Sequence, residues 1–285
     1  MNRPNRKTGW LPLTVILTGV FVLAVMVPWL PLPDPGEQNL GERLRPPAWQ
    51  AGGDVTHLLG TDHLGRDMAA RLLYGARLTF FITIAGVVFS ASVGGLLGIL
   101  AGYHRGWLDA VVSRVIEAQL ALPFMLLAIS IIASSGRSIF IVIFVLATHG
   151  WAQYARILRG ETLAIRERPF VVGLRAAGAS SSRIAFRHIL PNIGATFFVV
   201  ATLEMRAMIL GEGALSFLGL GVVAPQISWG LMLAEGRNHM VNAWWVVAFP
   251  GLAMSFVVLA VNLLGDQLRS VYDPRLQGYG YRTGG

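Results

Sequence analysis

Four ionisable residues stand inside or beside long apolar runs, and they are the first place to look for chemistry in this chain of 285 residues. They are Glu117, Glu204, Arg206 and Glu212. A charge in an apolar segment is costly, so it usually meets a partner or faces a polar cavity. Two interpretations of Glu204 and Arg206 stay open: a neutralised structural pair, locally or with a partner subunit, or the lining of a solute path. We place Met208 and Glu212 with them as candidate residues of such a path.

No pattern typical of a catalytic centre accompanies these charges. The sequence has no cysteine, no Gly-x-Ser-x-Gly, no His-Glu-x-x-His and no phosphate-binding loop ending in Gly-Lys-Ser/Thr. Asp62, His63 and Asp67 could suggest a metal site, but oxygen-rich metal loops usually bring more ligands, which favours a hydrogen-bonded turn instead. We therefore expect no enzyme activity, no metal and no cofactor of its own in this chain.

The composition indicates a membrane protein. Hydrophobic residues make up 54% and charged residues only 13%, about half the charged share of an ordinary soluble domain. The net charge of +8 fits arginines placed beside membrane spans better than a nucleic-acid surface, because no basic run is interleaved with stacking aromatics. The predicted fold class is therefore an all-α membrane protein.

Apolar runs of sufficient length predict six transmembrane helices. They are expected at 10–30, 78–101, 110–133 with a kink at Pro123, 138 to beyond 151, 193–210 and 243–265. The corresponding division is a cytoplasmic N-terminus and first helix at 1–30, an extracytoplasmic loop at 31–76, a core at 77–265 and a tail at 266–285. In the second span, small residues recur at every fourth position, which lets another helix approach closely. These are Gly86, Ser90, Gly94, Gly98 and Gly102.

The distribution of basic residues predicts the orientation. Fifteen of the 23 Lys and Arg lie in the N-terminus, at 102–114, at 156–187 and in the tail, whereas seven lie in the opposite loops. Cytoplasmic loops carry this excess, so both termini are expected in the cytoplasm.

A polar, arginine-rich segment at 166–192, here called the elbow, lies between the fourth and fifth spans. Gly178 is expected to end a first short helix, and Ser180 or Ser181 to cap a second one that stops before Pro191. The apolar face of Val171, Leu174 and Phe186 has no lipid to bury in, which predicts a protein partner. The elbow is thus expected to be a docking element.

The elbow resembles the cytoplasmic "EAA" loop of ABC importer permeases. Gly178 aligns with the glycine of that pattern and Leu190-Pro191 with its end, while Val172 stands at the glutamate and His188 at the isoleucine. The resemblance implies contact with an ATPase through the tip of the elbow and its end. The residues concerned are Val172, Arg175, Ala176, Ala177, Gly178, Ala179, Ser180, Leu190 and Pro191.

Other motifs extend the resemblance over nearly the whole chain after residue 58. The stretch 59–67 is similar to the Leu-Gly-Thr-Asp-x-x-Gly-Arg-Asp loop of the C-type permease of dipeptide and oligopeptide importers. The matching residues are Gly60, Thr61, Asp62, Gly65, Arg66 and Asp67. The stretches 212–230 and 249–275 resemble the outer loop, last span and tail of the same subunit.

The resemblance implies a type I ABC importer permease fold in the plasma membrane of a prokaryote, the inner membrane if the cell is Gram-negative. The implied assembly is a B-type permease subunit as the other half of the pore, two ATP-binding subunits that bind ATP-Mg, and an extracytoplasmic substrate-binding protein, in membrane lipid and without nucleic acid. The implied solute is a dipeptide or oligopeptide. The alternatives are another small solute, such as a nickel complex or glutathione, or an ion-coupled secondary transporter using Glu204 and Arg206.

Overall fold

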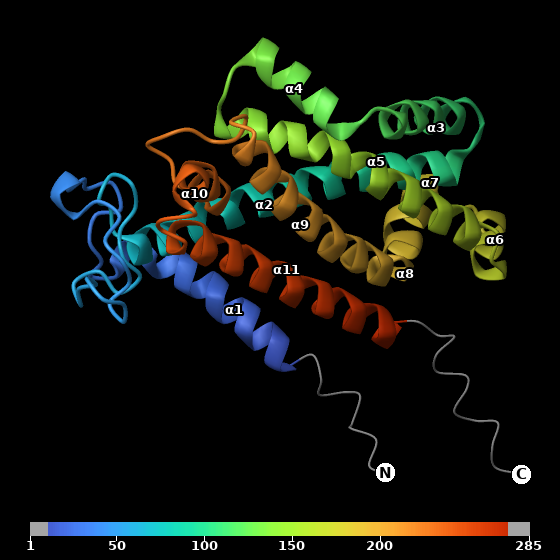
Figure 1. Ribbon diagram of the computed structural model, residues 1–285. Helices are drawn as coiled ribbons and strands as arrows, with labels where there is room; N and C mark the ends of the chain where they lie inside the picture. Colours follow the sequence, from blue (N-terminus) through green and yellow to red (C-terminus); the bar gives the residue numbers. More distant parts are fainter. Residues whose placement is uncertain (1–10, 273–285) are drawn as a thin grey trace, which may run out of the picture.

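The computed structural model describes residues 11–272, and this part of the chain is helical throughout apart from its loops and one isolated bridge between Thr61 and Asp67. Figure 1 shows the helices as an open bundle. The long helices are α1 (Leu11–Met26), α2 (Met68–His104), α3 (Gly106–Ala121), α4 (Phe124–Ser135), α5 (Ile139–Arg166), α9 (Gly194–Phe217) and α11 (Trp245–Tyr272). The short ones are α6 (Pro169–Ala176), α7 (Ser181–Arg183), α8 (Leu190–Asn192) and α10 (Trp229–Gly236).

Four of these helices, α2, α5, α9 and α11, are long and apolar enough to cross a membrane. The pair α3 and α4 also passes if it is taken as one broken span, which gives up to five, and α1 contributes a shorter apolar segment, Leu17–Trp29. These counts refer to residues 11–272. The prediction of a multi-spanning all-α protein is therefore confirmed at this coarser level.

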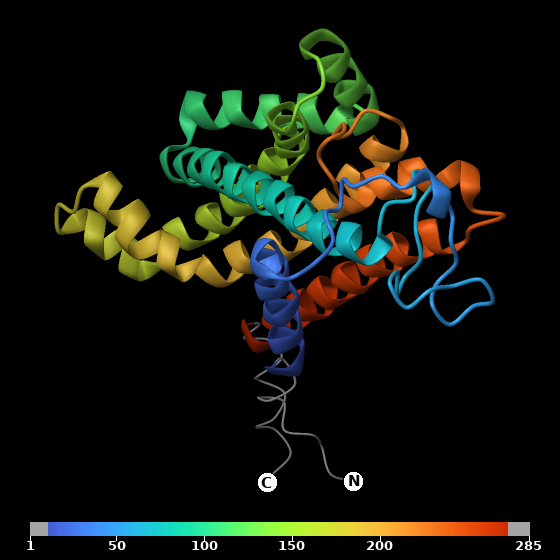
Figure 2. The ribbon, with the colours of Figure 1, turned by 90° about the vertical axis from the view of Figure 1, so that its left-hand side faces the viewer.

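The bundle has two distinct ends, which Figures 1 and 2 show on opposite sides of the molecule. One end, here called the loop end, carries residues 30–67 and α10. The other, here called the elbow end, carries α6, α7, α8 and the turn between α2 and α3. An ion pair of 2.9 Å between Arg105 and Glu167 joins that turn to the elbow. The bundle therefore presents two chemically different surfaces.

The central packing element is the seam between α2 and α5. A Cβ added at Gly94 would lie 2.2 Å from the carbonyl oxygen of Trp151, and one at Gly98 would lie 2.6 Å from that of Ala155. Both contacts join residues 57 positions apart in the sequence, so the two helices run parallel in register. The predicted small-residue stripe is thus confirmed as a close helix contact.

The third predicted span is not one kinked helix. The axes of α3 and α4 meet at 91°, because Leu122 and Pro123 both adopt extended backbone angles between them. The residue before a proline is driven out of the helical region by the proline ring, which explains why α3 ends there. Glu117 is exposed on α3, where it pairs with Arg114 at 3.1 Å, and its place among the intramembrane charges stays a prediction.

Helix boundaries differ from the predicted ones at three other places. Helix α2 begins at Met68, inside the predicted loop 31–76, because the Asp67 side chain accepts a hydrogen bond from the Ala70 amide and caps it. Helix α9 continues to Phe217, and α10 occupies part of what the sequence predicted as a loop. Helix α11 continues to Tyr272, so the first residues of the predicted tail are helical. The tail from 273 and the basic N-terminus lie outside the described residues.

Candidate functional site: the elbow, the loop end and the buried acids

The elbow folds as a helical hairpin whose turn is set by Gly178. This glycine has a φ of +79°, in the left-handed region, and follows the end of α6. The Ala179 amide donates to the Leu174 carbonyl oxygen at 3.0 Å, and the Ser180 hydroxyl accepts from the Arg183 amide and caps α7. The predicted roles of Gly178 in ending the first helix and of Ser180 in capping the second are confirmed.

The second arm of the elbow does not stop before Pro191. A π-helical turn, Ile184–Ile189, follows α7, and Pro191 then stands at the start of α8, one residue before Asn192. A proline is tolerated at the first turn of a helix, where its missing amide would have had no partner. The π turn shifts the hydrogen-bond register of the helix by one residue, because the Leu190 amide donates to the carbonyl oxygen of Ala185, five residues earlier. The arm therefore leads into α9 with only a short break at Ile193.

One face of the elbow is buried against its own chain. Val171, Ile184 and Ile189 have no exposed surface, and they pack with Leu158 and Ile165 of α5. Leu174 is partly buried against the same cluster. The prediction that Val171 and Leu174 need a partner protein was wrong, since α5 covers them. The free apolar side chains are Phe170, Val172 and Phe186, which are 42%, 49% and 43% exposed.

Polar contacts fix the elbow further. The Arg166 guanidinium donates to the Tyr103 carbonyl oxygen, and Arg175 lies over the Tyr103 ring at 5.2 Å from its centroid. The elbow is therefore held from behind by an apolar cluster and by the contacts of Arg166 and Arg175 to Tyr103 of α2, while Ala176, Ala177, Gly178 and Ser180 are exposed at its tip. Of the other implied coupling residues, Ala179 and Leu190 are half-buried and Pro191 is exposed.

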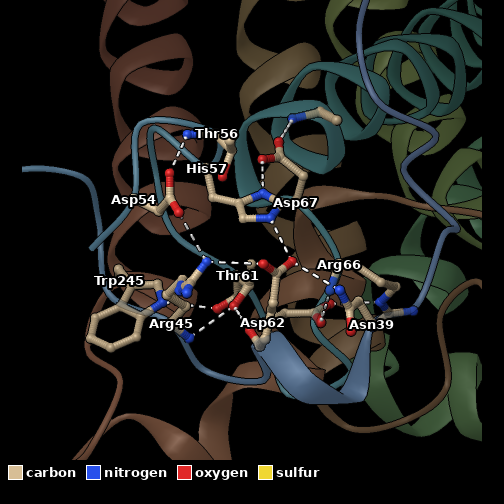
Figure 3. A network of polar contacts seen from close by, with 12 residues as sticks. Asn39, Arg45, Asp54, Thr56, His57, Thr61, Asp62, Arg66, Asp67 and Trp245 are labelled. Carbon is tan, nitrogen blue, oxygen red and sulfur yellow. Dashed lines mark hydrogen bonds and ion pairs between the residues drawn. The ribbon is translucent and has the colours of Figure 1, made fainter. Parts of the chain in front are cut away.

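At the loop end, the stretch 60–67 is a compact turn held by hydrogen bonds, as Figure 3 shows. The Asp62 carboxylate accepts from the Leu64 and Arg66 amides and from the Arg66 side chain, at 2.8, 3.0 and 2.7 Å. Gly65 has a φ of +75°, and a Cβ there would lie 1.8 Å from the Asn39 carbonyl oxygen, so only glycine fits. Trp245 of α11 donates to the Thr61 carbonyl oxygen at 2.9 Å and ties the turn to the bundle.

A second part of this network contains His57, which lies between two carboxylates. One ring nitrogen is 2.8 Å from Asp67 (Figure 3). The other is 3.1 Å from Glu42. Burial disfavours the charged imidazole, but the hydrogen bonds to Asp67 and Glu42 outweigh it and raise the pKa of His57. The loop is thus held by charge-assisted contacts as well as by its turn geometry.

Two arginines pair with Asp62 and Glu235 at the loop end. Arg66 and Arg71 each reach Glu235 of α10, at 2.9 and 2.7 Å, and each reaches Asp62, at 2.7 and 3.2 Å. Asp62, His63 and Glu235 lie close enough to share a cation, but their charge is already balanced. Sequence reasoning missed Arg71 and Glu235, although an arginine four residues after the capping Asp67 was a signal on the sequence.

The candidate path residues lie in different surroundings. Glu204 of α9 is only 6% exposed, and among the described residues nothing donates a hydrogen bond to its Oε2 atom. Arg206 does not pair with it but donates to Asn262 of α11 at 2.9 Å. Met208 is buried against Gly86 of α2.

Glu212 is fully buried at the loop end of α9. Its carboxylate accepts hydrogen bonds from the Ser216 and Ser228 hydroxyls, both at 2.7 Å, and Ser228 caps α10. Glu212 therefore lies where it holds the return from α9 to α10, apart from Glu204.

Comparison with known proteins agrees with this architecture. Residues 94–278 match the model of the family described as binding-protein-dependent transport system inner membrane component. The di/tripeptide transport system permease protein DppC of Pseudomonas aeruginosa is 42% identical over 254 residues, which are 89% of this chain and 84% of that protein. The dipeptide transport system permease protein DppC of Escherichia coli is 41% identical over 273 residues, 96% of this chain and 91% of that protein.

The fold has also been seen in a solved structure. The MetNI methionine ABC transporter in inward-facing conformations matches with a TM-score of 0.60 and 20% identity, over 72% of this chain and 98% of that chain. The same helical fold thus occurs in an ABC transporter. The chain belongs to the family of binding-protein-dependent transport system inner membrane components.

Proposed function

We propose that this chain is the C-type permease subunit of an ATP-driven importer of dipeptides and oligopeptides and forms half of its translocation pore. The relatives that carry peptide transport in their names match along nearly the full chain, which supports the solute class. The other half of the pore is a B-type permease. ATP-Mg is bound and hydrolysed by two ATP-binding subunits, and an extracytoplasmic protein delivers the peptide.

The proposed orientation places the elbow end in the cytoplasm. Helix α2 runs from the loop end to the elbow end, the broken pair α3–α4 returns, and α5 runs to the elbow again. Helices α9 and α11 are antiparallel, since Arg206 contacts Asn262 while Gly213 lies against Met254. With α1 as a further crossing, six spans put both termini at the elbow end. The excess of arginine at that end supports the assignment.

The observation that carries the proposal is the one-sided burial of the elbow. A segment that transmits force must be fixed to its own helices and free on its outer side. The cluster of Val171, Ile184 and Ile189 fixes it to α5, and the tip around Gly178 is free. Motion of an ATP-binding subunit docked on this tip would therefore pass directly to α5 and α9.

The test compares two glycines of the elbow. A Cβ at either Gly173 or Gly178 would have nothing within 4 Å, but only Gly178 has a positive φ. Gly178→Val costs on the order of 1 to 2 kcal/mol or more in the native turn and redirects the second arm. Gly173→Val is the matched control, and Ala177→Arg adds bulk at the tip without changing the turn.

We expect Gly178→Val and Ala177→Arg to keep the B-type partner bound but to lose retention of the ATP-binding subunits, or to uncouple ATP hydrolysis from peptide uptake. The measurement is pull-down together with uptake, in membranes with equal permease levels. Full retention and full uptake in both variants would show that the elbow is not the coupling element.

A further inference from the structure

A cavity of about 310 Å³ lies between α4, α5 and α9. Its walls are largely apolar, and Phe124, His149, Glu204 and Ala207 are among the residues that line it. The rings of Phe124 and His149 pack at 5.4 Å between centroids. A concave, mostly apolar space with a few polar groups is the usual form of a small-molecule site.

The acid that lines this cavity has one oxygen, Oε2, that is buried without a hydrogen-bond donor among the described residues on the side of Gly150 of α5, where an added Cβ would lie 2.9 Å from it. Glu204 is 94% buried, and among residues 11–272 no group donates to its Oε2 atom. The nearest basic residue in sequence, Arg206, is engaged by Asn262 on α11. A buried carboxylate is normally paired, so an unpaired one in a cavity points to a cationic group that comes from outside the chain.

A second feature sets this side of the bundle apart from a lipid-facing surface. The break between α3 and α4 leaves Leu122 and Pro123 in extended conformation, and Phe124, which follows at once, lines the cavity. Backbone outside a helix is tolerated at membrane depth only where protein buries it or where it lines a water-filled space. The break therefore places the cavity beside water or a partner subunit, not beside acyl chains.

We infer that this cavity is a cation-accepting contact on the solute path, in which Glu204 takes the ammonium group of a passing peptide. The inference rests on the proposed function and adds the chemical group that is recognised. The free amino terminus is common to peptides whatever their side chains. One carboxylate in an apolar wall can thus bind the amino terminus of the peptide without selecting among its side chains.

This chain has no cysteine, so an introduced thiol is the only one that the subunit brings to the assembled transporter, and the complex without it gives the background. Ala207→Cys places a thiol at the cavity, and Val241→Cys, on a residue 91% exposed, serves as the reference. The rates of modification by a cationic and by an anionic methanethiosulfonate are compared. We expect the cationic reagent to be favoured at position 207 by about tenfold relative to position 241, because an acid in a low-dielectric cavity concentrates cations.

The charge of Glu204 is then changed on the Ala207→Cys background. Glu204→Gln should abolish the preference, and Glu204→Asp, which keeps the charge, should retain it. Glu117→Gln removes an exposed acid on α3 and should leave the preference unchanged. Adding a dipeptide with the binding protein and ATP should slow modification, whereas KCl at matched ionic strength should not, which distinguishes a peptide ammonium from an inorganic cation.

The inference is overturned if the preference survives Glu204→Gln, or if the thiol at 207 is unreactive in the complex. Reactivity in the isolated subunit but not in the complex would mean that a basic side chain of the partner permease fills the cavity. Peptide uptake by the unmodified complex is measured in parallel. Its failure would refute the proposed function, whereas a retained charge preference would still show a cation site.

Discussion

Asp62 and Glu235 at the loop end differ from Glu204 in the cavity in one respect, which is whether an arginine of the chain pairs with them. Asp62 and Glu235 meet two arginines within 3.2 Å, while Glu204 meets none within the described residues. The same contrast separates the α2–α5 seam, where the two helix backbones pack closely, from the exposed tip of the elbow. Completed regions hold the fold, and incomplete ones are where other molecules are expected to act.

The largest effect on stability is expected when a completed site is opened. Arg71→Ala removes a guanidinium that is 1% exposed and leaves Asp62 and Glu235 short of a partner. Removing one side of a buried ion pair costs about 3 to 5 kcal/mol. Thermal unfolding in detergent measures the loss. The exposed Arg77 on the same helix is the control, and equal melting temperatures for Arg71→Ala and Arg77→Ala would contradict the contrast drawn above.

The next largest loss of stability is expected from a substitution in the α2–α5 seam. Gly94→Ala puts a methyl group into a space where the nearest atom, the Trp151 carbonyl oxygen, is 2.2 Å away. Overpacking of this kind costs about 1 to 3 kcal/mol. Gly160→Ala on α5 is the matched control, since nothing lies within 4 Å of its added carbon. A melting temperature that falls equally for both variants would mean that α2 and α5 are not in this register.

Glu204, which has no partner within the described residues, should respond differently: its substitution should change stability little. Glu204→Gln removes a charge that has no partner in the described chain, so the free energy of unfolding should change by less than about 1 kcal/mol. Assembly with the partner subunits, followed by size-exclusion chromatography, should likewise stay normal while peptide uptake falls. A large loss of stability without a partner subunit present would place Glu204 among the completed sites.

The smallest effect is expected at His57 and depends on pH. Because the folded protein raises the pKa of this imidazole above its ordinary value of 6.5, its stabilising contribution is fully present below that value and is lost as pH rises through the raised pKa. The difference in melting temperature between the wild type and His57→Gln should therefore be larger at acidic than at alkaline pH. A difference that grows with rising pH would contradict the contacts to Asp67 and Glu42.

Local patterns in the sequence were sufficient to predict much of the fold. The apolar runs identified the long helices, and four-residue spacing identified the face of α2 that packs closely. Gly178 and Ser180 marked the turn of the elbow because left-handed backbone and helix capping are properties of a few neighbouring residues. The compact turn at 60–67 was likewise predicted from Asp62, Arg66 and Asp67.

Only the tertiary structure decided which charged groups pair and which apolar side chains cover one another. Arg71 and Glu235 are 164 residues apart in the sequence, and α5 covers Val171 and Leu174 from outside the elbow. One proline follows the end of α3 at a break of 91°, whereas Pro191 follows a π turn and begins α8, so the residue type alone did not predict either geometry. Burial and pairing are set by residues far away in the chain, so the sequence determined that Glu204 lies in an apolar helix, and the fold determined that it is left unpaired.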